Sequence, residues 1–326
     1  MRLAGKVLAA ACAALAIGVS TGVGAQAFPN KPLRMVVPFP AGGTTDIIAR
    51  LVAQRMSEAF GQPVVVENRG GAGGSIGADV VAKSAPDGHT LLMHNITFPM
   101  ASVALALAGR SPYNVDTDFA GVSIAANVPL VMTASTGVAA RDLKEFVALV
   151  KKERGTAFSY GSTGPGSFMN VMGEALKRDA GIEMTHIPFK GAAPLKQELL
   201  AARLHMGGDQ ISSSLADIKS GKLKALATHS GKRVPDLPDV PTVREQGFPL
   251  LEADGWNGIF VAAKTPRDII DRLQKETAAA VRHPDVTKRL LDLAAEPIAS
   301  SPAEQDAILK KQMDQFRPII QTMKLE

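Results

Sequence analysis

A loop between a predicted strand and a predicted helix carries the residues best suited to chemistry. Leu33 to Val37 is apolar and rich in valine, which is typical of a buried strand. Prolines and glycines end it, and Thr44, Thr45 and Asp46 follow with side-chain oxygens suited to capping a helix. Unpaired N–H groups and the helix dipole attract negative charge at such a helix start. The stretch therefore predicts a binding site for a small anion.

A similar arrangement recurs in the middle of the chain. Residues 158–162 predict a short strand, 163–167 form a glycine-rich loop, and 168–180 predict a helix that ends at Gly181. Two strand–loop–helix units indicate two lobes, each of which presents one helix start to a shared cleft. The resulting hypothesis is a protein that binds a small carboxylate between two domains.

The predicted turn that precedes residue 192 has two interpretations. Phe189 either packs in the core or lies at the cleft edge, and Lys190 is either a solvated charge or a cation near the cleft. In the second interpretation Lys190 adds long-range attraction for an anion.

Composition excludes one broad class of function. The chain has 326 residues, of which 46% are hydrophobic, enough for two domains with their own cores. Its formal net charge is +5, aromatic residues are few, and no long basic run exists. Nucleic-acid binding is not expected, because it needs clustered Lys and Arg along the phosphate path.

The N-terminus resembles a secretory signal. Arg2 and Lys6 precede an apolar run over 7–19, and small residues suited to cleavage lead up to Ala27. We expect residues 1–27 to be removed and the remainder to act in the periplasm. The single cysteine, Cys12, lies in this segment, so the mature chain would have no disulfide, thiolate metal site or Cys nucleophile.

The order of predicted elements indicates an α/β protein of two lobes joined by two crossings, the hinge-bending design of a binding protein. Each lobe is expected to hold a mostly parallel sheet flanked by helices, because strands alternate with helices along most of the chain. Two long apolar runs, 119–134 and 252–262, are expected to cross between the lobes as hinge strands. The predicted domains are 1–27 as signal peptide, 28–127 plus about 249–326 as lobe one, and 128–248 as lobe two.

Catalysis is not expected, although one alternative remains open. Residues 73–77 match a G-x-S-x-G pattern around Ser75, but the serine lacks the preceding strand that a nucleophile elbow requires. A loop close to the cleft is the preferred interpretation. A secreted hydrolase that uses Ser75 or Ser162 is the alternative. The six histidines show no metal-ligand spacing, and neither a metal nor a cofactor is expected.

Further motifs resemble one family along the chain from about residue 28 to the C-terminus. The family is the periplasmic substrate-binding component of tripartite tricarboxylate transporters, also called the Bug receptors. The matching stretches are 28–34, 37–43 with Asp46 and 49–50, 61–68, 71–74 with 76–77, 85–88, 160–162 with Gly164 and Gly166, 188–191, 221–223 with 225–227, and 237–242.

The resemblance implies a Venus-flytrap receptor that closes on a small organic carboxylate and delivers it to membrane permease subunits. A ligand-sensing receptor for a membrane signalling protein is another possible role, and a monomer is expected. The family's binding loops, carried onto this chain, imply ligand contacts at Phe39, Ala41, Gly42, Gly43, Thr44, Asp46, Ser162, Thr163, Gly164, Gly166, Ser167, Phe189, Lys190, Gly191 and Asp209. The chain departs from the family's pattern at Asn170, where relatives usually carry His. It also departs at 201–205, where relatives often have Gly-Gly-Gln-Val-Asp.

Overall fold

The computed structural model describes residues 28–153 and 158–323. Contacts divide the chain after Asn30, and every element below belongs to the second unit, Lys31–Glu326. The expected signal segment, 1–27, lies outside the described residues. Within the described ranges, no helix combines the length and the apolar character needed to cross a membrane.

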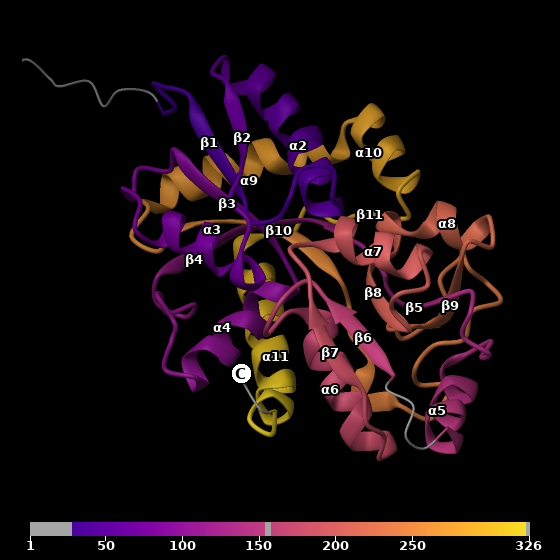
Figure 1. Cartoon of the computed structure of the whole chain (residues 1–326). Helices are drawn as coiled ribbons and strands as arrows, with labels where there is room; N and C mark the ends of the chain where they lie inside the picture. Colours follow the sequence, from indigo (N-terminus) through magenta and orange to yellow (C-terminus); the bar gives the residue numbers. More distant parts are fainter. Residues whose placement is uncertain (1–27, 154–157, 324–326) are drawn as a thin grey trace, which may run out of the picture. The chain divides into compact units, whose positions relative to one another are not determined.

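One sheet holds the first predicted strand. Among the described residues it has six strands in the order β11-β4-β10-β3-β1-β2 (Figure 1). The strands are β1 (Leu33–Val37), β2 (Val64–Asn68), β3 (Thr90–Asn95), β4 (Phe119–Asn127), β10 (Trp256–Ala262) and β11 (Glu296–Pro297). Strand β1 pairs in parallel with β2 and β3, whereas β10 is antiparallel to both β3 and β4.

A second sheet is built from the middle of the chain. In the described ranges its five strands follow the order β7-β6-β8-β5-β9. They are β5 (Leu130–Ser135), β6 (Ser159–Ser162), β7 (Thr185–Pro188), β8 (Met206–Gln210) and β9 (Leu223–Thr228). Strand β6 is parallel to β7 and β8, but β5 is antiparallel to β8 and β9. Both sheets are therefore mixed, not mostly parallel, because β5 and β10 run against their neighbours.

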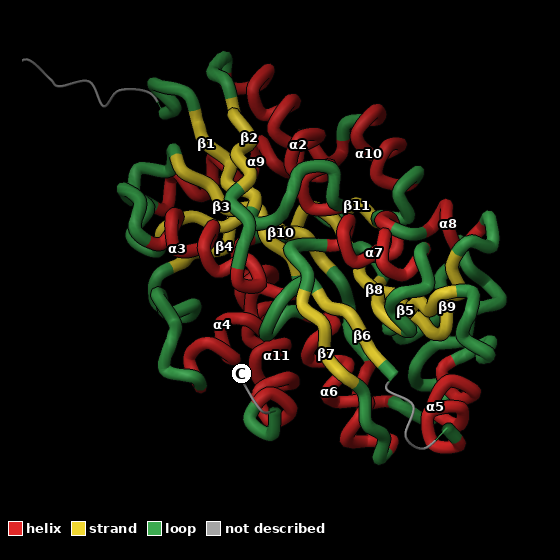
Figure 2. Tube along the Cα trace, viewed as in Figure 1, coloured by secondary structure: helices red, strands yellow, loops and turns green. Residues whose placement is uncertain are grey.

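Helices flank both sheets (Figure 2). They are α2 (Thr44–Phe60), α3 (Ser75–Ala82), α4 (Thr97–Leu107), α5 (Leu143–Lys152), α6 (Phe168–Ala180), α7 (Ala192–Leu200), α8 (Leu215–Lys219), α9 (Arg267–Arg282), α10 (Pro284–Leu291) and α11 (Pro302–Ile320), with short 3₁₀ turns η1 (Ala72–Gly74), η2 (Ile211–Ser213) and η3 (Pro249–Leu251). Local sequence explains several boundaries. Gly61 and Gly181 end α2 and α6 in the left-handed conformation that glycine favours, and Ser301 with Glu304 forms a capping box at α11.

The chain passes from one sheet to the other at residues 128–129. The apolar run 119–134, expected as one strand, is two strands in two sheets, since Pro129 supplies no N–H for a continuous ladder. Just before β10, the Gly255 carbonyl accepts a hydrogen bond from Val128 N–H at 2.9 Å. The two crossing segments therefore lie side by side. The exact lobe boundaries remain a prediction.

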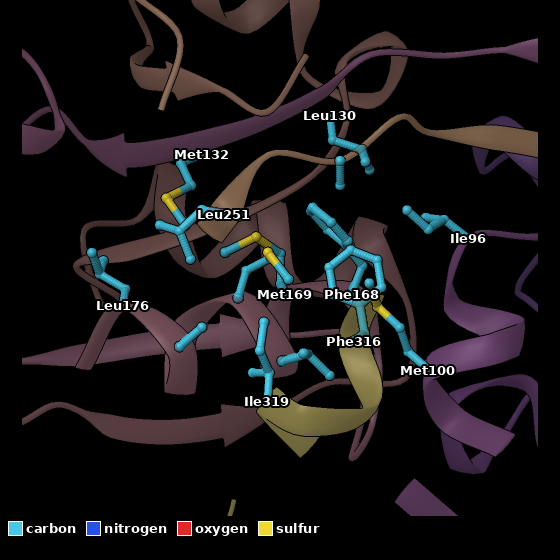
Figure 3. Packing of buried hydrophobic residues seen from close by; sticks show 14 of the residues in the cluster. Ile96, Met100, Leu130, Met132, Phe168, Met169, Leu176, Leu251, Phe316 and Ile319 are labelled. Atoms are coloured by element: carbon cyan, nitrogen blue, oxygen red, sulfur yellow. The ribbon is translucent and has the colours of Figure 1, made fainter. Parts of the chain in front are cut away.

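One apolar cluster joins elements of both sheets. Figure 3 shows Met100 of α4, Phe168 of α6 and Phe316 of α11 close together, with Met132 of β5 in the same buried cluster. Helix α11, the C-terminal helix, packs against both α4 and α6. The half of the chain around the first sheet and the half around the second sheet, here called the two halves, thus meet through buried hydrophobic side chains as well as through their loops.

Candidate functional site

Helix α2 begins without a side-chain cap. Gly43 is its N-cap residue in extended conformation, and no side chain bonds the free helical N–H groups there. Thr44 and Thr45 form the first turn and are buried. The expectation that Thr44, Thr45 or Asp46 would cap this helix was wrong, because all three lie inside it. The first N–H groups of a helix have no intrahelical partner, so this start keeps donors for a ligand.

The Asp46 side chain instead stabilises the loop that precedes α2. Its carboxylate accepts hydrogen bonds from Gly42 N–H (2.9 Å), Arg50 Nε (3.0 Å) and Asn68 Nδ2 (2.8 Å). Asn68 also donates to the carbonyl of Phe39 at 3.0 Å. Burial alone would raise the pKa of Asp46, but these hydrogen bonds hold the pKa below its ordinary value. The carboxylate stays ionised and holds the loop over residues 39–42.

Two asparagines on the first sheet position the start of α2. Thr45 Oγ1 donates to Asn257 Oδ1 of β10 at 2.8 Å and accepts from Asn95 Nδ2 of β3 at 3.1 Å. All three side chains are at least nine-tenths buried. Buried polar groups are costly unless paired, so this arrangement fixes the helix start relative to both strands.

The second glycine-rich loop is held by its own side chains. Ser162 Oγ lies 3.1 Å from Gly164 N, whose N–H it accepts, and 2.7 Å from His186 Nε2. Asn170, the residue that departs from the family's pattern, accepts from Gly166 N–H at 2.9 Å. Asn170 therefore supports this loop from inside α6.

The two halves meet around a small, partly open space, here called the inner cavity, of about 30 Å³. Its lining comprises Phe39, Pro40, Ala41, Gly43, Thr44, Thr45, Asn95, Thr163, Ala192, Ala193, Asp209 and Gln210. The starts of α2 and α7 both face it, and neither N-cap residue, Gly43 nor Gly191, is capped by a side chain. Helix α7 thus takes the place expected for α6, whose first residue donates to Thr97 Oγ1 of the other half at 3.4 Å.

Gln210 adds a donor that the sequence did not indicate. Its side chain is 1% exposed and lines the inner cavity, and Nε2 finds no hydrogen-bond partner within the described part of the chain. A buried amide is rarely left unpaired, and each such case needs an explanation.

Asp209, beside Gln210, is the acidic residue of the cavity lining. Burial raises the pKa of its carboxyl to about 6, although a hydrogen bond from the Gln210 backbone acts in the opposite direction.

A second space, here called the outer cleft, adjoins the first and measures about 240 Å³. Phe39, Pro40 and Thr163 line both. The rest of its lining is Pro38, Gly71, Ala72, Gly73, Gly74, Gly164, Pro165, Pro188, Phe189, Lys190 and Gly191. The loop over 71–74 therefore lies at the cleft, and the exposed Lys190 brings a positive charge to its edge.

The residues nominated from the family's loops fall into three groups. Inner-cavity lining includes Phe39, Ala41, Gly43, Thr44, Thr163 and Asp209. Outer-cleft lining includes Phe39, Thr163, Gly164, Phe189, Lys190 and Gly191. Gly42, Asp46, Ser162, Gly166 and Ser167 line neither space and belong to the loops and helix starts beneath them.

Three polar residues line the inner cavity but were not among the ligand contacts predicted from the sequence: Thr45, Asn95 and Gln210. Asn95 and Gln210 each end a strand, and only the position of those strand ends in the sheet reveals them. Asn257, the second asparagine that positions the start of α2, is the second residue of β10, and the sequence did not indicate its role either.

The geometry does not favour the hydrolase alternative. Ser162 is fully buried, and its hydroxyl donates to Gly164 O at 3.1 Å while bordering neither space. Ser75 is the first residue of α3 and is 5% exposed. The absence of catalysis nevertheless stays a prediction.

Two mixed sheets flanked by helices, with a cavity where their loops meet, define a solute-binding protein of the two-lobe periplasmic class. The model of the family described as "Tripartite tricarboxylate transporter family receptor" matches residues 48–325. The chain therefore belongs to the tripartite tricarboxylate transporter family receptors, as its motifs predicted.

Similar proteins agree with this assignment. The chain is 33% identical to Protein BugT of Bordetella pertussis over 304 residues, 93% of this chain and 92% of that protein. The periplasmic binding protein BugD superposes with a TM-score of 0.83 at 35% identity, over 92% of this chain and 99% of BugD. MatC from Rhodopseudomonas palustris, solved with bound malate, gives a TM-score of 0.84 at 33% identity, over 90% of this chain and all of MatC.

Proposed function

We propose that this chain is a periplasmic receptor that binds a small organic carboxylate and delivers it to a tripartite tricarboxylate-type permease. One carboxylate group would occupy the inner cavity, and the rest of the ligand would extend into the outer cleft. The single observation that carries the proposal is the convergence of the uncapped α2 and α7 starts on one cavity, whose lining also includes Gln210. The malate bound to MatC supports the same ligand class.

The dimensions suit this division. A cavity needs only about 10–15 Å³ open to the centre of a water molecule to hold one water, so about 30 Å³ by the same measure accommodates a group with two oxygens, such as a carboxylate. The outer cleft is about eight times larger and is lined by apolar and glycine residues, with Lys190 at its edge. A carbon chain with a second polar group fits that description.

The available donors suffice for a useful affinity. Micromolar binding requires about 8 kcal/mol. Hydrogen bonds to a charged group contribute roughly 1.5–3 kcal/mol each. Four to six donors from the two helix starts, Thr44, Thr163 and Gln210 would cover this, less the ordering cost of association.

The finer assignments belong to the same proposal. Lobe one would comprise 28–127 and about 249–326, and lobe two 128–248, with the crossings near residues 128 and 255 as the hinge. Ligand contacts would come from the nominated residues that line the two spaces, while Asp46 and Ser162 would hold the loops in place. A monomeric state, cleavage near Ala27 and membrane permease partners are part of the same proposal.

A thermal-shift screen of mono-, di- and tricarboxylates, followed by calorimetry, tests the proposal. The informative variant is Gln210→Leu, with the exposed Gln197→Leu as matched control. Losing an unpaired buried amide should leave the melting temperature unchanged or raised, because the unpaired group costs free energy in the unliganded protein. The affinity should fall about tenfold or more, from the lost charge-assisted bond. Well-folded wild-type protein that no carboxylate stabilises would contradict the proposal.

A further inference from the structure

One acidic side chain stands among the donors of the inner cavity. Asp209 lies near the end of β8, opposite Val131 of β5, and lines the same space as the starts of α2 and α7. An ionised carboxylate at this place opposes the entry of an anion, because like charges in a confined site repel. The position therefore requires an account of how Asp209 is charged when the ligand is bound.

Cations on the nearest helix are engaged elsewhere. Lys196 of α7 pairs with Asp217 at 3.0 Å and donates to the Ser213 carbonyl at 2.8 Å. Glu198, the acid of the same helix, pairs with Arg203 at 2.7 Å. Strand β5 and the turn η2 carry no ionisable side chain. Neither α7 nor these elements therefore supplies a partner charge to Asp209.

The charged side chains of the other elements around β8 pair with one another or are exposed to solvent. Tyr160 of β6 donates to Glu174 of α6 at 2.6 Å, and Lys177 pairs with the same carboxylate at 3.0 Å. The other charged residues of α6, Arg178 and Asp179, are exposed. His205 precedes β8 at its opposite end, where its ring nitrogen lies 3.1 Å from Ser159 N.

On the side of the inner cavity opposite Asp209, no charged side chain from the described ranges belongs to the lining. Asp46 of α2 is bound by Arg50 and does not line the inner cavity. Lys190 lines only the outer cleft. Among the described residues, no ion pair includes Asp209, and the lining otherwise consists of residues without ionisable side chains. Burial has already moved the pKa of Asp209 to about 6, within reach of a further rise when an anion enters.

We propose that Asp209 holds a proton when the carboxylate binds, so that ligand binding takes up one proton from solution. This inference rests on the proposed function. Two carboxylates that share a site cannot both ionise easily, and one proton between them turns repulsion into a strong hydrogen bond. Asp209 is then one more donor in a cavity of donors, and the receptor is sensitive to pH in the range where the free carboxyl titrates.

The expected size of the effect follows from linkage. For a free-state pKa near 6 and a bound-state pKa of 8 or more, the dissociation constant should rise about 25- to 50-fold between pH 6 and pH 8. Near pH 7.5 almost every free Asp209 is ionised, so about one proton should be taken up per ligand bound.

Calorimetric titration of the wild-type protein with malate and with succinate, at pH 6 and pH 8, tests the proposal. Repeating it at pH 7.5 in HEPES and in Tris counts the protons, because the two buffers differ in ionisation enthalpy. Asp209→Asn should bind with the same affinity at both pH values, tighter than wild type at pH 8, and take up no proton. The exposed Asp239→Asn is the matched control and should keep the wild-type pH dependence.

Three outcomes would overturn the inference. The first is a wild-type affinity and heat that are independent of pH and buffer. The second is loss of binding in Asp209→Asn together with a strong preference for malate over succinate, which would mean that ionised Asp209 accepts from the ligand hydroxyl. The third is no binding of any carboxylate at any pH, which defeats the proposed function itself. Should Asp209→Asn fail to fold, the buffer experiment on the wild-type protein decides alone.

Discussion

Gly73→Ala should weaken ligand binding by blocking closure of the two halves. Gly73 lies in the loop after β2 with φ of +63°, and a Cβ built there would lie 2.9 Å from the carbonyl oxygen of Pro165, which follows β6 on the other sheet. Such a contact to a backbone atom is shorter than real Cβ atoms make. The halves would have to move apart to relieve it.

The chain offers a closely matched control. Gly61 ends α2 with φ of +64° and ψ of 16°, against 63° and 21° at Gly73, and a Cβ at Gly61 would meet nothing within 4 Å. Both substitutions place alanine in the left-handed region, at a cost of roughly 1 kcal/mol in stability. Only Gly73→Ala adds the contact with Pro165, which joins the two halves in this arrangement.

The expected loss of affinity in Gly73→Ala, relative to Gly61→Ala, comes from the contact with Pro165 alone. Overpacking of this kind costs typically 1–3 kcal/mol, and at about 1.4 kcal/mol per tenfold the affinity should fall roughly 5- to 150-fold. Melting temperatures of the two variants measure the backbone strain that they share. Calorimetry with malate measures the difference between their affinities. Equal affinities in Gly73→Ala and Gly61→Ala, after equal losses in melting temperature, would refute the argument that binding requires this closed arrangement.

Two further predictions concern buried ionisable groups. Asp46→Asn should lower stability by about 2 kcal/mol and weaken binding, because the new amide cannot accept from both loop donors; urea unfolding and calorimetry measure the two effects. Burial lowers the pKa of His94 to about 3 and of His229 to about 4, so their neutral forms stabilise the fold fully above pH 6.5 and progressively less as the pH falls. From pH 8 to pH 5 they should remove about 4 kcal/mol, while the raised pKa of Asp209 returns about 1 kcal/mol in the opposite direction. A stability that is flat in pH by urea unfolding would contradict this.

The sequence predicted helices and strands correctly where neighbouring residues alone determine them. The strand over 33–37 and the end of α2 at Gly61 follow from apolar residues and a single glycine, and both are present. The family's glycine-rich loops likewise led to the correct part of the molecule. Strand direction was harder. The sheets are mixed because β5 and β10 pair with strands distant in sequence, and no local pattern records which way a strand runs beside its neighbour.

The candidate site was predictable in its main-chain part and not in its side chains. Gly43 and Thr44 are the N-cap and first residue of a helix whose start the sequence predicts, but Asn95 and Gln210 reach the cavity only because β3 and β8 end there. The same holds for α7. Its uncapped start is as good an anion site as that of α6 by sequence, and tertiary packing alone decides that α6 faces Thr97 instead.

Closure and recognition depend on the same small residues. Where Gly73 approaches Pro165 and Gly191 approaches Pro40, a side chain on either glycine would hold the halves apart. The described residues that line the inner cavity include no Lys or Arg. Attraction for an anion must then come from helix starts, hydroxyls and the Gln210 amide, with Lys190 confined to the outer cleft. Without a full positive charge to neutralise it, an ionised Asp209 would be intolerable next to a carboxylate, which is why its proton belongs to the binding reaction.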